Sequence, residues 1–206
     1  PHSPPHLLRL SMKLSDAQAI IATGDIFLFE GVSFFGRWIK LHTRSRFSHV
    51  GIALWIQVDG IRRLCCIEAL EPWGVRLYPM DYYLGVCRRR GIVCHWFALK
   101  QDFGIDRAKV AGYGLAQWGK RYASPWQFLI SFGWLTRLVR KHIFGWDVVD
   151  TNPERFFCSE LVSDSLQHGG YRPDPNEGED AIAAGTEPGA IALFRCLDRR
   201  GTLSLD

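Results

Sequence analysis

Three side chains in this 206-residue sequence have the types and settings that thiol-based catalysis requires: Cys158, His49 and Glu68. A thiol attacks a carbonyl well only as the thiolate, which a helix N-terminus and a nearby imidazolium stabilise. Cys158 opens the segment Cys158 to His168, which has apolar residues at helical spacing and is followed by a glycine pair. The pattern therefore predicts a cysteine at a helix N-terminus, whose unpaired amides could also bind an oxyanion.

A catalytic cysteine also needs a base, and His49 is the best placed of the seven histidines. It begins a β-rich segment, which would hold its side chain rigidly. The other six are expected in the N-terminal tail, on helices or, for His95, in a strand without an acidic neighbour. These settings favour His49 as the base.

A predicted β-hairpin links His49 to Glu68. The turn signal Asp59-Gly60 lies between two β-rich segments, and a two-residue turn there would place Gly51 opposite Glu68. Residues two apart in a strand share a face of the sheet. His49 and Glu68 are therefore predicted to be diagonal neighbours, and the missing side chain of Gly51 leaves the carboxylate room to reach the imidazole.

The residues that flank Glu68 also suggest a partner for it. They are apolar on both sides, and a carboxylate in such surroundings usually has a partner that offsets its desolvation. We therefore expect Glu68 to orient His49. The alternatives without a catalytic role are a solvated strand carboxylate for Glu68 and a small buried residue at the start of a helix for Cys158.

The elements that would position these residues indicate an α+β fold with a small, mainly antiparallel sheet and the cysteine helix packed against it. We expect a single domain over 1–206, with 1–12 as a flexible tail and 125–146 as a helical insert or lid. Strands are predicted near 24–29, 48–56, 62–70, 75–78, 92–99 and 190–196, and helices near 32–43, 106–120 and 158–168.

Composition narrows the classes of function. The net charge of +4 comes from scattered Lys and Arg, without a nucleic-acid-binding signature, so we expect no nucleic-acid partner. The six cysteines stand in mostly apolar surroundings and are expected to be buried free thiols in a reducing compartment. The more specific alternative is a zinc site, which would be built from Cys87, Cys94, His95 and the pair Cys65-Cys66. No C-x-x-C spacing supports it. We expect no metal and no cofactor.

Four segments, taken in order, resemble one known group. They are Gly24-Asp25-Ile26, Ser48 to Ile52, Ile67-Glu68-Ala69 and Phe157 to Val162. Together they are similar to the permuted branch of the NlpC-type papain-like amidases, which also holds lecithin–retinol acyltransferase-like enzymes. The order His, Glu, Cys is the inverse of papain's. The resemblance implies a circularly permuted papain-like fold with Cys158, His49 and Glu68 as a catalytic triad.

The resemblance also covers Gly119 to Tyr122, which is similar to a family element whose tyrosine lies near the thiol. Tyr122 and Ser159 are therefore assigned to substrate binding or to the oxyanion. Family members often have Asp after this tyrosine, whereas here Ala123 follows. The aromatic and basic segment 126–146 is either a core-packing helix or a surface that contacts a membrane or a partner.

The leading hypothesis is a cysteine amidase or peptidase that acts on short or cell-wall-type peptides through a thioester. The alternatives are a thiol acyltransferase or phospholipase acting on lipid and a catalytically silent binding module. The substrate would be a peptide or an acyl small molecule. No secretory signal is visible, so we expect a cytoplasmic protein.

Overall fold

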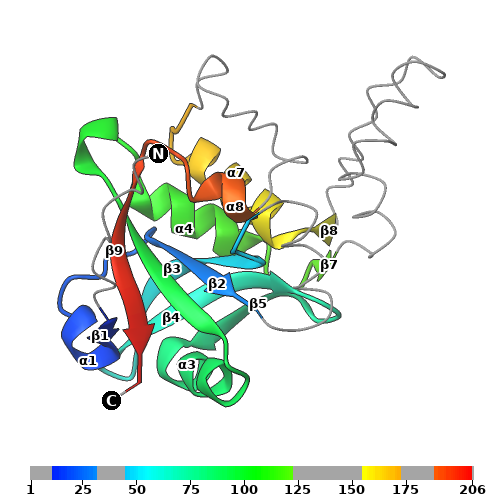
Figure 1. Cartoon of the computed structure of the whole chain (residues 1–206). Helices are drawn as coiled ribbons and strands as arrows, with labels where there is room; N and C mark the ends of the chain where they lie inside the picture. Colours follow the sequence, from blue (N-terminus) through cyan, green and yellow to red (C-terminus); the bar gives the residue numbers. More distant parts are fainter. Residues whose placement is uncertain (1–10, 32–44, 123–154, 173–187, 206) are drawn as a thin grey trace, which may run out of the picture.

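The computed structural model describes residues 11–31, 45–122, 155–172 and 188–205. Its centre is a seven-stranded sheet of order β1-β9-β6-β2-β3-β4-β5 (Figure 1). Neighbouring strands are antiparallel except β1 and β9. The strands are β1 (Ser11–Lys13), β2 (Ile26–Glu30), β3 (His49–Val58), β4 (Ile61–Leu70), β5 (Gly74–Pro79), β6 (Val93–Leu99) and β9 (Leu197–Ser204). The expected α+β class with a mostly antiparallel sheet is confirmed.

Helices cover both faces of this sheet. One face carries α3, which contacts β4, β5 and β6, and the other carries α4 and α7, which pack on each other and on β3 and β4 (Figure 1). A separate parallel pair, β7 and β8, leads into α7. These elements are α1 (Leu14–Ala17), α3 (Met80–Arg89), the 3₁₀ helix η1 (Gln101–Phe103), α4 (Arg107–Ala116), β7 (Arg121–Tyr122), β8 (Arg155–Phe156), α7 (Cys158–His168) and α8 (Pro188–Ile191).

Alternating strand residues build one core on each face. On the α7 side, Ile52 of β3 and Ile67 of β4 pack with Leu161 and Leu166 of the helix. On the α3 side, a second cluster joins Phe29 of β2 to residues of α3. The sheet therefore separates two apolar layers, and α7 is anchored by its own buried face, as the periodicity of its sequence predicts.

Most predicted elements near the site match the structure. The cysteine helix spans Cys158–His168, and Asp106 caps α4 by accepting a hydrogen bond from the Lys109 amide at 3.1 Å. Helix α3 was not predicted. The flexible tail expected over 1–12 includes Ser11 and Met12, but these two residues belong to β1. Residues 1–10, the expected helix near 32–43 and the segment 125–146 lie outside the described residues.

The prediction of a strand at 190–196 is wrong. Exposure alternates there, with Phe194 and Cys196 buried and Leu193 exposed, so the segment resembles a strand by period. Its amides are used locally, however, because Leu193 bonds to Ala190 and Phe194 to Ile191. The chain thus makes the short helix α8 and turns before β9 begins at Leu197.

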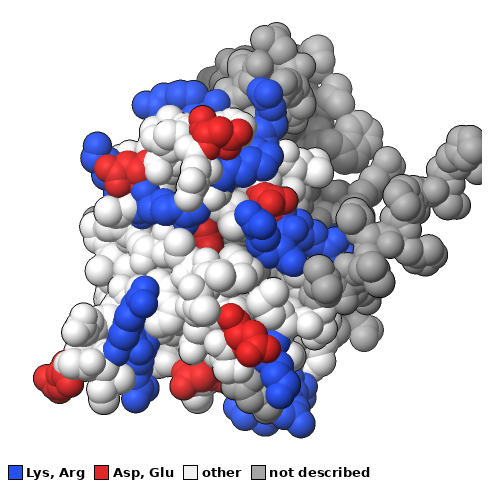
Figure 2. All heavy atoms as spheres, turned by 90° about the vertical axis from the view of Figure 1, so that its left-hand side faces the viewer, with Lys and Arg blue, Asp and Glu red and all other residues white. Residues whose placement is uncertain are grey.

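On the face that Figure 2 shows, Lys and Arg lie in several separate groups with Asp and Glu between them. This arrangement matches the scattered charge of the sequence. Among the described residues, no helix is long and apolar enough to cross a membrane.

Candidate active site

The β3–β4 hairpin has the predicted register. Val58 pairs with Ile61 around a two-residue turn. Both turn residues have positive φ, 50° at Asp59 and 77° at Gly60, as a type I′ turn requires. The turn therefore fixes which residues face each other at the far end of the hairpin.

His49 and Glu68 meet at that far end. Gly51 lies opposite Glu68, and His49 is two residues before Gly51 on the same face. The Nε2 atom of His49 lies 2.5 Å from Oε2 of Glu68. The two side chains are thus within hydrogen-bonding reach on one face of the hairpin, as predicted.

Gly51 is required at its position because β3 and β4 approach closely there. A Cβ at Gly51 would lie 2.4 Å from Sγ of Cys66, 2.9 Å from the carbonyl oxygen of Ile67 and 3.4 Å from Cβ of Glu68. A side chain at position 51 would therefore push β4 away. Glycine keeps the carboxylate beside the histidine.

Glu68 has a second hydrogen-bonding partner that the sequence did not reveal. Its side chain is fully buried, and the Tyr83 hydroxyl donates to Oε2 at 2.6 Å. Tyr83 lies on α3, a helix for which no prediction was made. The pattern Met80, Leu84, Cys87, whose members are all buried, is the signal that could have revealed the helix.

Cys158 is the first residue of α7, which places its thiol at the positive end of the helix dipole. The Phe157 amide, just before it, donates to the Glu160 side chain at 3.2 Å. The first intrahelical bond runs from Leu161 to the Phe157 carbonyl, so the amides of Cys158 and Ser159 have no intrahelical acceptor. The helix start is therefore capped while these two amides remain at its N-terminus.

The structure brings His49 against Cys158. Burial lowers the pKa of His49, but the negative charges of Cys158 and Glu68 and their side-chain hydrogen bonds to the ring outweigh burial and raise the pKa from 6.5 to about 10. Since Nε2 faces Glu68, Nδ1 is the nitrogen left for the thiol. His49 therefore lies between an acid and a thiol and carries a proton at neutral pH.

Tyr122 also reaches the thiol. Strand β7 pairs Tyr122 with Phe156, two residues before Cys158, and the Tyr122 side chain lies close enough to Cys158 for the charge of that residue to act on its hydroxyl. Burial, followed by the charge of Cys158, raises the pKa of Tyr122 well above 10, so its hydroxyl stays protonated. Ser159 is 1% exposed and lies in the first turn of α7, next to Cys158.

His95 is a second histidine beside a carboxylate, and its pKa can be compared with that of His49. The expectation that it has no acidic neighbour is wrong, because Nε2 of His95 lies 2.5 Å from Oε1 of Glu30 on the adjacent strand β2. Burial, with the charges of Arg199 and Arg46, outweighs Glu30 and lowers the pKa of His95 to about 4. This fully buried histidine is neutral at pH 7, unlike His49.

The other thiols are in different settings. All six cysteines are buried and none is in a disulfide, as expected. Burial raises the pKa of Cys65, Cys66 and Cys94, and raises that of Cys87 to about 12. Cys158 differs from these four thiols in lying beside His49.

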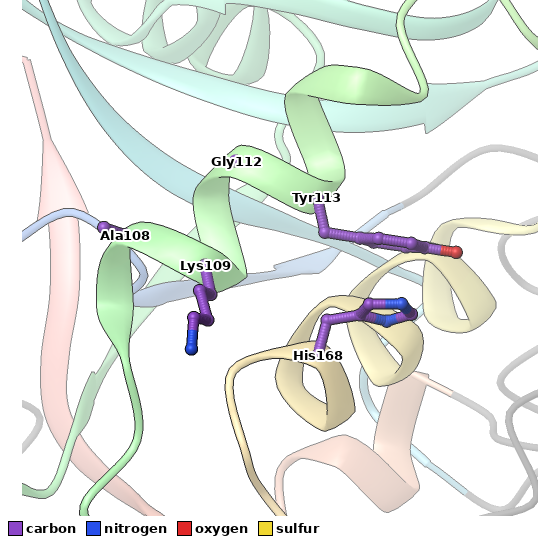
Figure 3. A pocket seen from close by; sticks show the side chains of 5 residues that line it. All are labelled: Ala108, Lys109, Gly112, Tyr113 and His168. Carbon is purple, nitrogen blue, oxygen red and sulfur yellow. The ribbon is translucent and has the colours of Figure 1, made fainter.

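A surface pocket of about 460 Å³ lies elsewhere, between α4 and the end of α7. Figure 3 shows the rings of Tyr113 and His168 side by side in it, with centroids 3.8 Å apart. His168 is the last residue of α7 and Cys158 the first, so the helix separates them by about 15 Å at 1.5 Å per residue. This pocket is distinct from the cysteine site.

Comparisons with known proteins place the fold but not the family. No protein-family model matches the sequence, and no curated protein matches it. A crystal structure of metalloprotein yiiX from Escherichia coli O157:H7, also described as DUF1105, superposes with a TM-score of 0.54 and 19% identity. The match covers 87% of this chain and 96% of that one. Within the described part of this chain, no three His, Cys, Asp or Glu side chains are grouped so as to hold a metal ion.

Proposed function

We propose that this chain is a cysteine hydrolase of the permuted papain-like type, with Cys158 as nucleophile, His49 as base and Glu68 as the residue that orients His49. The observation that carries the proposal is that one imidazole contacts both a buried carboxylate and a thiol at a helix N-terminus. An imidazole beside a thiol at a helix N-terminus supports a thiolate–imidazolium pair, which is the reactive form of a cysteine nucleophile.

The reaction would proceed in two halves. The Cys158 thiolate adds to the carbonyl carbon of an amide, and the carbonyl oxygen becomes an oxyanion. The C–N bond then breaks as His49 gives its proton to the leaving amine, which yields a thioester on Cys158. Water, deprotonated by the now neutral His49, attacks the thioester, and the carboxylic acid leaves as the thiol is regenerated.

Two kinds of hydrogen-bond donor near Cys158 support the proposed stabilisation of the oxyanion. The amides of Cys158 and Ser159 lie in the first turn of α7 without an intrahelical acceptor. The Tyr122 hydroxyl is a protonated donor that contacts the thiol. Donors fixed before the reaction stabilise developing charge without reorganisation, which is the main way such sites lower a barrier.

The amide in the proposed reaction belongs to a short or cell-wall-type peptide. A lipid acyl group would use the same three residues, and the segment 126–146, which suggested contact with lipid, lies outside the described residues. The matched yiiX structure is described as a metalloprotein, but the proposed mechanism uses the side chains of this chain alone.

Trapping the thioester tests the proposal without knowledge of the natural substrate. The protein is mixed with p-nitrophenyl acetate, quenched in acid within a second and analysed by peptide mass spectrometry. We expect one acetyl group on Cys158, which disappears on longer incubation, and none at that position in Cys158→Ala. Cys87→Ala, which removes a different buried thiol, should still be acetylated at Cys158.

The same variants then identify the substrate class. Dipeptides, cell-wall peptides and phospholipids are each incubated with the wild type and with Cys158→Ala. Release of an amine from a peptide by the wild type alone supports the proposal, whereas release of fatty acid alone would replace the peptide with a lipid. A folded wild type that never acquires an acetyl group on Cys158 would refute the hydrolase proposal.

A further inference from the structure

Within the described residues, both hydrogen bonds to the Glu68 carboxylate go to the same oxygen. Oε2 accepts from His49 at 2.5 Å and from Tyr83 at 2.6 Å. Among the described residues, the buried Oε1 has no hydrogen-bonding partner. Tyr83 therefore supplies one of the two hydrogen bonds that fix the orientation of this fully buried carboxylate.

The ring of Tyr83 is itself held on two sides. Phe29 of β2 meets it edge to face at 5.1 Å and 81°, and Tyr78 of β5 stacks on it at 6.0 Å and 11°. Phe29 also packs against the His49 ring at 5.6 Å. The rings of Tyr83 and His49 thus both pack against Phe29, which holds the two donors at fixed positions around Glu68.

Tyr83 remains a donor at any pH at which the protein would work. Burial, followed by the negative charge of Glu68, raises its pKa well above 10. Its proton therefore stays on the hydroxyl and points to the carboxylate. A donor to an ionised group makes a stronger hydrogen bond than a neutral pair does.

We propose that Tyr83 is a positioning residue of this site: by donating to Oε2 of Glu68 from α3, it fixes the carboxylate in the orientation that aligns His49 with Cys158. The inference rests on the proposed function. Tyr83 acts only through Glu68, so it affects the chemical step and not the binding of substrate.

Tyr83→Phe tests this role by removing one hydroxyl from an otherwise unchanged ring. Tyr82→Phe is the matched control, because Tyr82 is the next residue of α3 and 59% exposed. With p-nitrophenyl acetate, we expect kcat of Tyr83→Phe to fall roughly tenfold, the usual effect of a hydrogen bond to a charged group, with KM within about twofold. Tyr82→Phe should match the wild type.

A double variant separates positioning from general destabilisation. If Tyr83 acts through the charge of Glu68, adding Tyr83→Phe to Glu68→Gln should lower kcat by less than about twofold further. An unchanged kcat in folded Tyr83→Phe, a loss confined to KM, or a full additional loss in the double variant would overturn the inference. If Tyr83→Phe does not fold, 3-fluorotyrosine at position 83, a more acidic donor, must change kcat, and the same group at position 82 must not.

A second readout distinguishes failure of this inference from failure of the proposed function. The rate at which iodoacetamide modifies Cys158 at about pH 6 reports the thiolate–imidazolium pair without any turnover. If Cys158 reacts fast in the wild type and more slowly in Tyr83→Phe, the inference is supported. If Cys158 reacts equally fast in both proteins, Tyr83 does not belong to the site, and the hydrolase proposal stands. A wild type that shows neither turnover nor this reactivity defeats both.

Discussion

Gly51 lies directly opposite Glu68 in the β3–β4 hairpin, and its lack of a side chain lets the carboxylate lie beside His49. The contact depends on the two-residue turn Asp59-Gly60, which follows the end of β3 and begins eight residues after Gly51. Local turn geometry thus determines the position of the His49–Glu68 pair at the other end of the hairpin.

Gly51→Ala should therefore destabilise the fold and disturb the His49–Glu68 pair. The new Cβ would lie 2.4 Å from Sγ of Cys66 and 2.9 Å from the Ile67 carbonyl oxygen, so the strands must separate. We expect a loss of about 1–3 kcal/mol in the free energy of unfolding, measured by urea denaturation. Gly112→Ala is the control, because a Cβ there meets no atom within 4 Å and a helical alanine should be neutral or stabilising. Equal stability of Gly51→Ala and the wild type would mean that the close approach is not required.

Replacement of each member of the pair should reveal their roles. His49→Ala removes the proposed base and should lower kcat by about a thousandfold or more. Glu68→Gln keeps a group that can accept the N–H bond but loses the charge, so kcat should fall less. Circular dichroism must show that both variants are folded. A larger loss in Glu68→Gln than in His49→Ala would reverse the assigned roles.

The raised pKa of His49 predicts how stability depends on alkaline pH. The folded state binds this proton more tightly than the unfolded state, whose pKa is 6.5. The contribution of His49 to stability is therefore fully present below pH 6.5 and is lost as the pH rises through about 10. Urea denaturation of the wild type and of His49→Gln at several pH values measures the difference, which should shrink with rising pH. A difference that does not change with pH would contradict the raised pKa.

His95 predicts the opposite trend on the acid side. Its pKa is lowered to about 4, because burial and the facing charges of Arg199 and Arg46 outweigh Glu30. The unfolded state binds the proton more tightly, so this contribution is present above pH 6.5 and is lost as the pH falls through about 4. His95→Gln, which can still donate and accept, should reduce the loss of stability on acidification. Iodoacetamide reactivity of Cys158 should not change in this variant, and a change would place His95 in the site.

The parts of the fold that sequence reasoning predicted correctly are those specified by nearby residues. The Asp59-Gly60 turn set the hairpin register, and the apolar spacing after Cys158 set the bounds of α7. The positions of His49 and Glu68 follow from these local signals together with the period of a strand.

The parts that were missed depend on contacts between distant segments. Tyr83 reaches Glu68 because α3 covers that face of the sheet, and Glu30 reaches His95 because β2 and β6 are neighbours. Neither contact has a signal in the residues around it. The segment at 190–196 has the alternation of a strand, but its amides bond locally and it forms no ladder.

The most direct test of the proposed site is the reactivity of its thiol. The native protein is treated briefly with iodoacetamide at about pH 6, where an ordinary thiol is almost wholly protonated, and the six cysteines are compared by peptide mass spectrometry. We predict that Cys158 is modified first and that His49→Ala abolishes this reactivity, since the imidazolium that stabilises the thiolate is gone. Similar modification of several cysteines, or a Cys158 rate that His49→Ala leaves unchanged, would contradict a thiolate–imidazolium pair and favour a binding module without catalysis.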